Sequence, residues 1–475
     1  MIELKRCILL SFPLPVGQNL IPEDVLLEPP WLLAPDGTSN RAQCINSKKE
    51  ANLPLSVQRA SKSSASQDLD AVVESNIRVT PESHWQDVRH ITFSSTSQAK
   101  YEAGDVIVIY PHNPKEHVQE MIDLMCWQDA ADQKICFVRN SQDLTAGPNA
   151  KTPSFSSQSN STATTLRDLL TRHLDINSIP RRSFFGVIAH FTKDEFQRNR
   201  LEEFSNTEYL DELYDYTTRP RRSILEVLQE FDTVRIPWQW AATVFPSLRG
   251  RQFSIASGGK LMDGPNSTTR FEVIVAIVKY RTVIRKIRRG VCSRYLEGLS
   301  SGTRISTTLQ IGGLGITNTD MTRPFVLVGP GTGIAPIRSL LWQRLAWSSQ
   351  HDRSSLGRCA LFFGCRNEDA DFFFKDDWKY LKDEMPLEVY PAFSRDQTQK
   401  QYVQDLITHN SKTLYEIICL EQGIIFVCGS SGKMPLAVRA AIKGAIVKES
   451  SMSEADAESY MIMMEKNGRY KQETW

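Results

Sequence analysis

A glycine-rich turn at residues 329–333 is the first group that could do chemistry. It reads Gly329-Pro-Gly331-Thr332-Gly333 and lies between an apolar run at 325–328 and a helix-like segment at 335–347. Glycines let the backbone turn sharply and approach a ligand closely, and the helix start offers free N–H groups and a positive dipole end to phosphate. Such a turn can also be purely structural, but the flanking strand and helix favour a nucleotide-phosphate site.

A second group of polar residues follows the predicted strand at 387–392. Arginine offers a planar fork, lysine a point charge, and serine and tyrosine neutral donors, which together suit a dianionic phosphate monoester. The alternative is a solvated basic loop. Combined with the glycine turn, the group predicts binding of the 2′-phosphate of NADPH, which NADH lacks. Its members are Ser394, Arg395, Lys400, Gln401, Tyr402, Val403 and Gln404.

Two further segments could contact a flavin nucleotide. In the first, Arg251 can pair with a diphosphate, Phe253 can stack on an aromatic ring and Ser254 can reach the flavin edge, although an ordinary strand could also carry these residues. The second, Gly290-Val291-Cys292-Ser293, precedes a helix start and could form another phosphate cradle. The last residue, Trp475, is either a frayed terminal side chain or an aromatic lid on a flat cofactor.

Composition narrows the class of protein. The 475 residues include 56 Lys and Arg against 55 Asp and Glu, and this balance argues against a nucleic-acid binder. Nine scattered cysteines without a CxxC pair predict free thiols in a reducing compartment and no metal site. No segment has 18 consecutive apolar residues, so we expect no transmembrane helix and a soluble, cytoplasmic protein that does not bind membranes.

The elements that must position these residues change along the chain. Alternating patterns predict strands at 77–80, 88–93, 105–110, 251–256 and 271–280, and helical spacing dominates 164–250. Buried apolar strands at 325–328, 359–364, 387–392 and 424–428 alternate with helices. The sequence therefore predicts a β-rich domain with a helical insertion, followed by a doubly wound, parallel α/β domain.

These motifs, in this order, resemble the diflavin reductase family, which includes cytochrome P450 reductase and the flavoprotein of sulfite reductase. The segments 175–185, 219–225, 363–366 and 473–475 add to the resemblance, which covers roughly 77–475. It implies an antiparallel FAD-binding β-barrel of the ferredoxin–NADP reductase type and an NADPH-binding α/β domain. We expect a linker or partly disordered tail at 1–75, the FAD-binding domain at 76–320 with its helical insertion at about 164–250, and the NADPH-binding domain at 321–475.

The resemblance also assigns roles to residues. NADPH would be held by the glycine turn, Thr332 included, and by the 394–404 group, and hydride would pass beside Ser254, Cys428, Glu473 and Trp475. Phe253 replaces the more usual tyrosine, and Ala437 stands where an acidic residue is common. The implied FAD contacts are Arg221, Arg251, Phe253, Ser254, Gly290, Val291, Cys292, Ser293 and Trp475.

The family carries an FMN-binding, flavodoxin-like domain before this region. Residues 1–75 are too short and irregular for one, so we expect FMN only where a flavodoxin domain is supplied from elsewhere. The resemblance implies that electrons pass from FAD to FMN and then to an acceptor, for one branch an anamorsin-type iron–sulfur protein of cytosolic iron–sulfur cluster assembly. The alternative is a non-catalytic interaction module derived from such a reductase.

Overall fold

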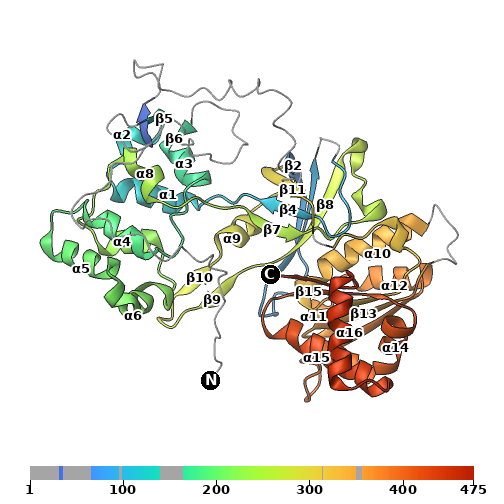
Figure 1. Ribbon diagram of the computed structural model, residues 1–475. Coiled ribbons are helices and arrows are strands. Elements are labelled where there is room, and N and C mark those ends of the chain that lie inside the picture. Colours follow the sequence, from blue (N-terminus) through green and yellow to red (C-terminus); the bar gives the residue numbers. More distant parts are fainter. Residues whose placement is uncertain (1–30, 36–65, 96–98, 140–163, 313, 349–355) are drawn as a thin grey trace, which may run out of the picture. The chain divides into compact units, whose positions relative to one another are not determined.

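The computed structural model describes residues 31–35, 66–95, 99–139, 164–312, 314–348 and 356–475 (Figure 1). The chain divides into two compact units. The helical unit contains Tyr110–Arg251 and Val278–Leu296 together with the N-terminal strand at 31–35. The two-sheet unit contains Ser63–Ile109, Gln252–Ile277 and Glu297–Trp475.

The helical unit packs short helices around one apolar core, with Phe185, Leu228 and Val234 fully buried. Ser223 caps helix α7: its hydroxyl accepts the N–H of Glu226, whose side chain in turn accepts the Ser223 N–H. A three-stranded sheet (β1, β5, β6) and a hairpin (β9, β10) complete the unit. The bounds are β1 Trp31–Pro35, α1 Lys115–Leu124, α2 Gln128–Ala131, β5 Lys134–Arg139, β6 Thr164–Thr165, α3 Leu166–Arg172, α4 Arg182–Ala189, α5 Glu195–Ser205, α6 Leu210–Leu213, α7 Ile224–Glu230, α8 Ala241–Val244, β9 Lys279–Arg281, β10 Ile287–Arg289 and α9 Val291–Glu297.

The first sheet of the two-sheet unit is antiparallel and six-stranded, in the order β7-β4-β11-β2-β3-β8, in agreement with the antiparallel β-barrel that the family resemblance implies. Strand β2 starts at Ser66, inside the range 1–75 that the sequence analysis assigned to a linker. Its buried side chains Leu69, Ala71 and Val73 alternate with polar ones, the pattern of a strand with one buried face. The bounds are β2 Ser66–Arg78, β3 Val88–Ser95, β4 Val106–Ile109, β7 Arg251–Ser254, β8 Thr269–Ala276 and β11 Arg304–Gln310.

The second sheet is parallel, in the order β14-β13-β12-β15-β16. The chain runs outward from β12 in one direction to β14 and then returns to β15 on the other side, so the predicted doubly wound fold is confirmed. Ligands bind at such switch points, outside the carboxyl ends of the strands. The bounds are β12 Phe325–Val328, α10 Ile334–Ser348, β13 Cys359–Cys365, α11 Glu368–Asp371, α12 Lys375–Glu384, β14 Leu387–Phe393, α13 Val403–His409, α14 Ser411–Tyr415, β15 Ile424–Gly429, α15 Lys433–Glu449, α16 Glu454–Lys466 and β16 Tyr470–Thr474.

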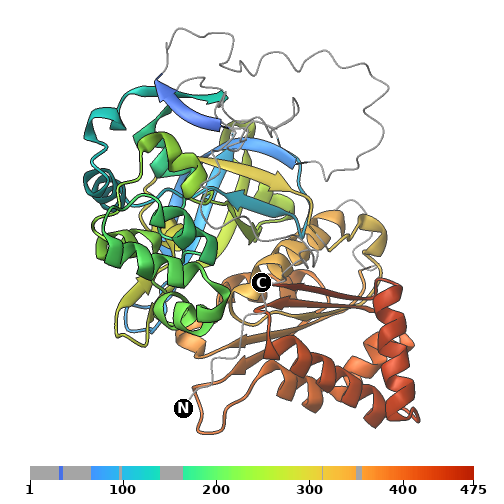
Figure 2. The same cartoon turned by 60° about the vertical axis from the view of Figure 1, so that its left-hand side comes forward.

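Helices cover both faces of the parallel sheet (Figure 2). Phe325 and Leu327 of β12 point to the face covered by α10 and α12, whereas Val326 and Val328 point to the face covered by α13, α15 and α16. All four side chains are fully buried, which explains why β12 reads as a continuous apolar run. Both faces are closed, so the open edge at the strand ends is where polar chemistry can occur.

Candidate functional site

The carboxyl edge of the parallel sheet gathers residues that lie far apart in the sequence. The glycine turn follows β12, Ser394 follows β14, Cys428 lies near the end of β15, and Trp475 follows β16. Strands β12 and β15 are direct neighbours, so the glycine turn and Cys428 meet at the switch point. The topology thus brings most of the sequence-predicted nucleotide residues to one edge.

Ser254 joins the antiparallel sheet to this edge. Its hydroxyl donates a hydrogen bond to the Glu473 carboxylate, 219 positions further along the chain. Glu473 lies directly opposite Cys428 in the parallel register of β15 and β16. Three of the four residues expected beside the hydride path therefore occupy one small region of the two-sheet unit.

Burial favours the protonated forms of Glu473 and Cys428. It raises the pKa of Glu473 above its ordinary value, although the hydrogen bond from Ser254 opposes the shift. Burial also raises the pKa of the Cys428 thiol, and the nearby Glu473 charge adds to that effect. One Glu473 oxygen, Oε2, is buried with no hydrogen-bond partner. A buried acceptor without a donor is costly, which is consistent with a site that a ligand donor completes.

Trp475, the fourth residue, is held by its backbone and leaves its ring exposed. Its N–H donates to the Gly429 carbonyl at 3.1 Å, and its carbonyl accepts the Ser431 N–H at 2.8 Å. The side chain is 52% exposed. An indole anchored only through its main chain can change its rotamer without breaking a strand, as a movable lid requires.

The glycine turn fits a phosphate-bearing cofactor. A Cβ on Gly333 would lie 2.3 Å from the Cys428 carbonyl oxygen, so glycine is what allows the turn to pack against β15. Gly331 has φ +58° and nothing within 4 Å of its Cβ position, which leaves open space beside the backbone. The turn leads into α10, whose first N–H groups suit an anion. This donor set matches the diphosphate of a dinucleotide.

The segment predicted to hold the 2′-phosphate, residues 394–404, begins at a hydrogen-bonded turn. Ser394 N–H donates to the Cys365 carbonyl at 3.0 Å, and Arg395 N–H donates to the Arg366 carbonyl at 2.8 Å. Ser394 is nearly buried, while Arg395, Lys400 and Tyr402 are exposed and Thr332, Gln401 and Gln404 are partly buried. The Val403 side chain is in the core, so only its backbone is left for a nucleotide.

The sequence analysis missed Arg366 and Trp85 as members of this region. The Arg366 guanidinium carbon lies 3.8 Å from the centroid of the exposed Trp85 ring. Burial, and then the positive charge of Arg395, lower the pKa of Arg366. Two arginines held this close favour a shared anion. The Phe-Gly-Cys-Arg segment at 363–366 pointed to Arg366 only through the family resemblance, and Trp85 carried no sequence signal.

A buried ionic network was also missed. Arg338 of α10 donates to the carboxylates of Glu272 (2.7 Å) and Asp377 (2.6 Å) and to the Ala256 carbonyl (2.9 Å). His90 donates to the same Glu272 at 2.9 Å. Burial alone would raise the pKa of Glu272, but the hydrogen bond from His90 and the charge of Arg338 lower it overall. The network fastens the helix behind the glycine turn to the segment that follows Ser254.

The remaining FAD candidates lie in the helical unit. Arg251 is its last residue before Gln252, and its charge acts on Asp175 and on Cys292, whose pKa burial raises to about 12. Gly290 precedes α9 directly, and its carbonyl accepts the Arg294 N–H at 2.8 Å in the first turn of the helix. Arg221 is exposed and has φ +55°, an uncommon conformation for a non-glycine residue that often marks functional positions. Val291 and Ser293 lie on the first turn of α9.

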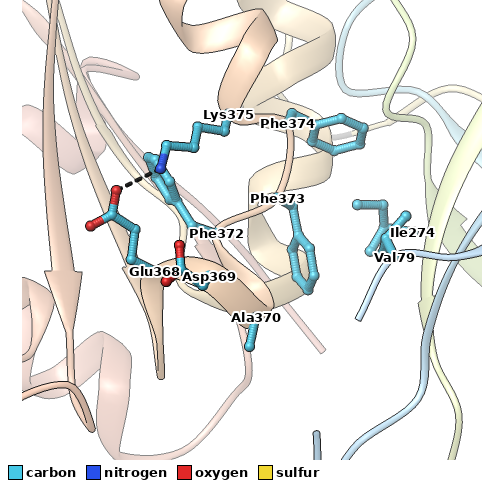
Figure 3. Close-up of a pocket in the computed structure, with 9 residues that line it drawn as sticks. All are labelled: Val79, Ile274, Glu368, Asp369, Ala370, Phe372, Phe373, Phe374 and Lys375. Carbon is cyan, nitrogen blue, oxygen red and sulfur yellow. Dashed lines mark hydrogen bonds and ion pairs between the residues drawn. The ribbon is translucent and has the colours of Figure 1, made fainter. Parts of the chain in front are cut away.

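A cavity of about 290 Å³ opens next to the α11–α12 segment (Figure 3). Phe373, Phe374 and Ile274 line its apolar side, and Lys375 pairs with Glu368 at 2.7 Å on its rim. It contains no residue from the predicted cofactor set.

No described helix reaches the length and apolar character needed to cross a bilayer. Within the same described ranges, His, Cys, Asp and Glu side chains form no cluster of three suited to a metal ion.

Comparison with known proteins places these observations in a family. Residues 61–295 match the family model "FAD binding domain", and residues 327–439 match "Oxidoreductase NAD-binding domain". The chain is 45% identical to NADPH-dependent diflavin oxidoreductase 1 of Emericella nidulans over 99% of its own length and 75% of the relative's. The same-named proteins of Aspergillus fumigatus and Xenopus laevis are 44% and 37% identical, each over 98% of this chain and 74% of the relative.

The two matched domains correspond to the two cofactors expected from the motifs, FAD and NADPH. They also agree with the antiparallel and parallel sheets of the structure. The chain belongs to the NADPH-dependent diflavin oxidoreductase 1 family of flavoprotein oxidoreductases.

Proposed function

We propose that hydride transfer from NADPH to FAD occurs beside Ser254, Cys428, Glu473 and Trp475. The observation that carries this proposal is the Ser254–Glu473 hydrogen bond, with Cys428 opposite Glu473 in the strand register. We assign the FAD-binding domain to residues 66–320, because β2 starts at Ser66 and not at the expected 76, with its helical insertion at about 164–250, and the NADPH-binding domain to 321–475. When bound, the two cofactors supply the redox chemistry itself.

The protein's own groups orient the reactants and exclude water. The Ser254 hydroxyl, fixed by Glu473, stays available to the flavin edge, and Phe253 beside it supplies an aromatic surface. The Cys428 thiol, fully buried and protonated, gives the site an uncharged wall. Glu473 holds a proton more readily than an ordinary glutamate because burial raises its pKa. The exposed indole of Trp475 would cover a bound flavin and would have to move aside for the nicotinamide.

The binding of the two nucleotides divides among the remaining candidates. Arg221, Arg251 and the turn at 290–293 would hold the FAD diphosphate. The glycine turn at 329–333 would hold the NADPH diphosphate, and the group at 394–404 would hold its 2′-phosphate. The proximity of Arg366 to Arg395 supports this assignment, because two guanidinium groups favour a doubly charged anion. We therefore expect NADPH to be strongly preferred over NADH.

Electrons then leave FAD for an acceptor protein. The diflavin name of the relatives supports a second flavin, FMN, in a flavodoxin-like domain as the next carrier. Beyond it we propose an anamorsin-type iron–sulfur protein that serves cytosolic iron–sulfur cluster assembly, which places the chain in the cytoplasm. This part of the proposal is based on the family resemblance.

The test is anaerobic stopped-flow reduction of the FAD-loaded chain by NADPH. Ser254→Ala should slow hydride transfer by about a hundredfold, because a small misplacement of reacting groups has effects of that size. FAD content and the affinity for 2′,5′-ADP should stay unchanged. The matched control, Ser300→Ala, makes the same chemical change at an exposed turn of the same unit. A Ser254→Ala rate within twofold of wild type would contradict the assignment.

A further inference from the structure

An exposed hairpin in the helical unit has a combination of side chains that the proposed function does not use. It comprises residues 279–289: strand β9, a turn at 282–286 and strand β10 (Figure 1). Thr282 fixes the turn, since its N–H and its hydroxyl both donate to the Lys286 carbonyl, at 2.9 and 3.1 Å. Arg285 N–H donates back to the Thr282 carbonyl at 2.9 Å. We call this segment the basic hairpin.

The basic hairpin and the residue before it expose an unusual amount of apolar surface. Eighteen large apolar side chains are exposed within the described residues, and five of them fall in the ten positions 278–287. Their exposed fractions run from 43% to 63%. Grouped exposed apolar side chains with a polar rim mark protein or membrane interaction sites, whereas scattered ones need no explanation. The five are Val278, Tyr280, Val283, Ile284 and Ile287.

The charges of the basic hairpin are all of one sign. Its eleven residues include six lysines and arginines and no acidic residue, although the whole chain is nearly neutral. Glu226 of α7 binds two of the cations, Lys286 and Arg288. Burial alone would raise the pKa of Glu226, but the hydrogen bonds from Arg288 and Lys286 lower it to about 2, so it stays ionised. Lys279, Arg281 and Arg285 are exposed as well, so the hairpin presents a positive surface.

Strand geometry separates the anchored side of the hairpin from its free side. Arg288 is largely buried and also donates to the Pro220 carbonyl at 3.1 Å, so it fastens one face to the unit. Side chains alternate between the two faces of a strand. Arg281 and Ile287 face each other across the pair and lie on the opposite side from Arg288. The outer face therefore has an apolar centre of Ile287, Val283 and Ile284, bordered by Lys279, Arg281 and Arg289, whereas Tyr280 shares the face of Arg288.

The base of the hairpin is bonded to the candidate FAD-phosphate turn. Gly290 N–H donates to the Val278 carbonyl at 3.0 Å, and Val278 N–H donates to the Ser293 hydroxyl at 3.0 Å. Three strand residues span about 10 Å, so the outer face begins close to the turn that would hold FAD. A partner seated on the hairpin is therefore brought to the flavin-bearing part of this unit.

We propose that the basic hairpin is the docking surface for the electron acceptor, a protein that presents acidic side chains around an apolar centre. The proposal rests on the proposed function, in which electrons leave FAD for a protein. Charge complementarity selects the acidic partner, and the apolar centre with a charged border matches the anatomy of a protein interface. Nucleic acid is less well matched, because Tyr280 is the one aromatic side chain in 279–289 that could stack on a base.

The first experiment measures binding without NADPH, so that it does not depend on turnover. The probe is a bacterial flavodoxin, an acidic FMN protein, labelled for fluorescence anisotropy and titrated with the FAD-loaded 475-residue chain at low salt. The double variant Arg281→Glu/Arg285→Glu should bind at least about tenfold more weakly, and the difference should shrink at high salt. Val283→Ser/Ile284→Ser should weaken binding at both salt concentrations. The matched control is Lys134→Glu/Lys193→Glu, two exposed lysines of the same unit.

The second experiment follows electron transfer to flavodoxin and to ferricyanide, a small acceptor that needs no docking surface. Flavodoxin reduction should slow in both hairpin variants while ferricyanide reduction and the melting temperature stay at wild-type values. Equal flavodoxin binding by wild type and hairpin variants would overturn the proposal. So would hairpin-dependent binding to phosphatidylserine vesicles or duplex DNA in place of flavodoxin. If the wild-type chain did not reduce ferricyanide, this result would contradict the proposed function. The binding titration would still decide the docking proposal.

Discussion

Replacement of Arg338 by methionine tests the buried network behind the glycine turn. Both Arg338 and Glu272 are more than nine-tenths buried, and their side chains meet at 2.7 Å. Methionine keeps much of the volume but leaves the Glu272 carboxylate with only the hydrogen bond from His90 among those described above. Removing one member of a buried ion pair costs about 3–5 kcal/mol, because the other charge stays buried without compensation. Asp377 loses less, since it is partly exposed and keeps the Trp342 indole N–H at 3.0 Å.

The stability that Arg338→Met loses should increase as pH rises. In the wild type the pKa of Glu272 is lowered, so its contribution to stability is present above its ordinary value of 4.5 and is lost as pH falls through the folded-state pKa. In Arg338→Met the positive charge is gone and burial dominates, so the folded-state pKa of Glu272 rises above 4.5. Ionised Glu272 then destabilises the fold, and the penalty grows as pH rises from about 5 to 8.

The assay is thermal and urea unfolding of the FAD-loaded chain, with hydrogen exchange of α10 as a local measure. A loss of about 3–5 kcal/mol corresponds to a fall of roughly 6–20 °C in melting temperature for a unit of this size. The double variant Arg338→Met/Glu272→Met should recover about 1–3 kcal/mol of the single variant's loss, because no charge is left unpaired. Arg358→Met is the matched control: this arginine also pairs with two carboxylates, Glu416 and Glu421, but is about one-third exposed.

The control, Arg358→Met, should lower the free energy of unfolding by less than about 1 kcal/mol. A similarly small loss for Arg338→Met, or a double variant no more stable than the single, would show that the network does not hold the helix as described. A penalty that shrinks as pH rises would contradict the assignment of Glu272 as the unpaired charge.

Three further outcomes are expected. Gly333→Ala should cost about 1–3 kcal/mol in urea unfolding, because the new methyl would meet the Cys428 carbonyl at 2.3 Å; an unchanged midpoint would argue against this close packing. Glu473→Gln should remove a fall in stability that the wild type shows as pH rises above about 4.5, since burial raises the pKa of this carboxyl, and parallel pH profiles would refute the reasoning. Trp85→Ala should weaken 2′,5′-ADP binding about two- to fivefold through the lost contact with Arg366, with ADP affinity as the control that stays constant.

Local patterns predicted the parallel sheet well. Strands β12, β13 and β15 fall where continuous apolar runs lie between helical segments, whereas the edge strand β14 carries the exposed Glu388. The glycine turn lies at the predicted strand-to-helix transition. Both signals are short in range: a buried parallel strand must be apolar throughout, and a tight turn needs glycine. The candidate edge was predictable because carboxyl ends of parallel strands share one side of the sheet.

The start of the antiparallel sheet was harder to predict. Polar residues surround Leu69, Ala71 and Val73, and the serine-rich stretch before them reads as linker. Only pairing with β3 and β11 shows that these three side chains face a core. Alternation over so few positions competes with a composition that is typical of disordered segments.

Contacts across long sequence separations could not be predicted from the sequence patterns alone. Arg338 and Glu272 are 66 positions apart, and Ser254 and Glu473 are 219 apart. An arginine in an otherwise apolar helix signals an internal partner but does not identify it. The hydrogen bond between Ser254 and Glu473 agrees with the family resemblance, but no pattern in the sequence pairs a serine on one strand with a glutamate at the end of another sheet.

Cys428 gives the protein a chemical reporter of its own motions. Alkylating reagents attack thiolates, and this sulfur is fully buried with its pKa raised, so it stays unreactive while β15 and β16 remain paired. Its modification then requires a transient opening of that strand pair, and the labelling rate measures how often the opening occurs. Exposed Cys126 reacts without such an event and provides the internal reference. Mass spectrometry of the two peptides would thus measure the rate at which the β15–β16 strand pair opens.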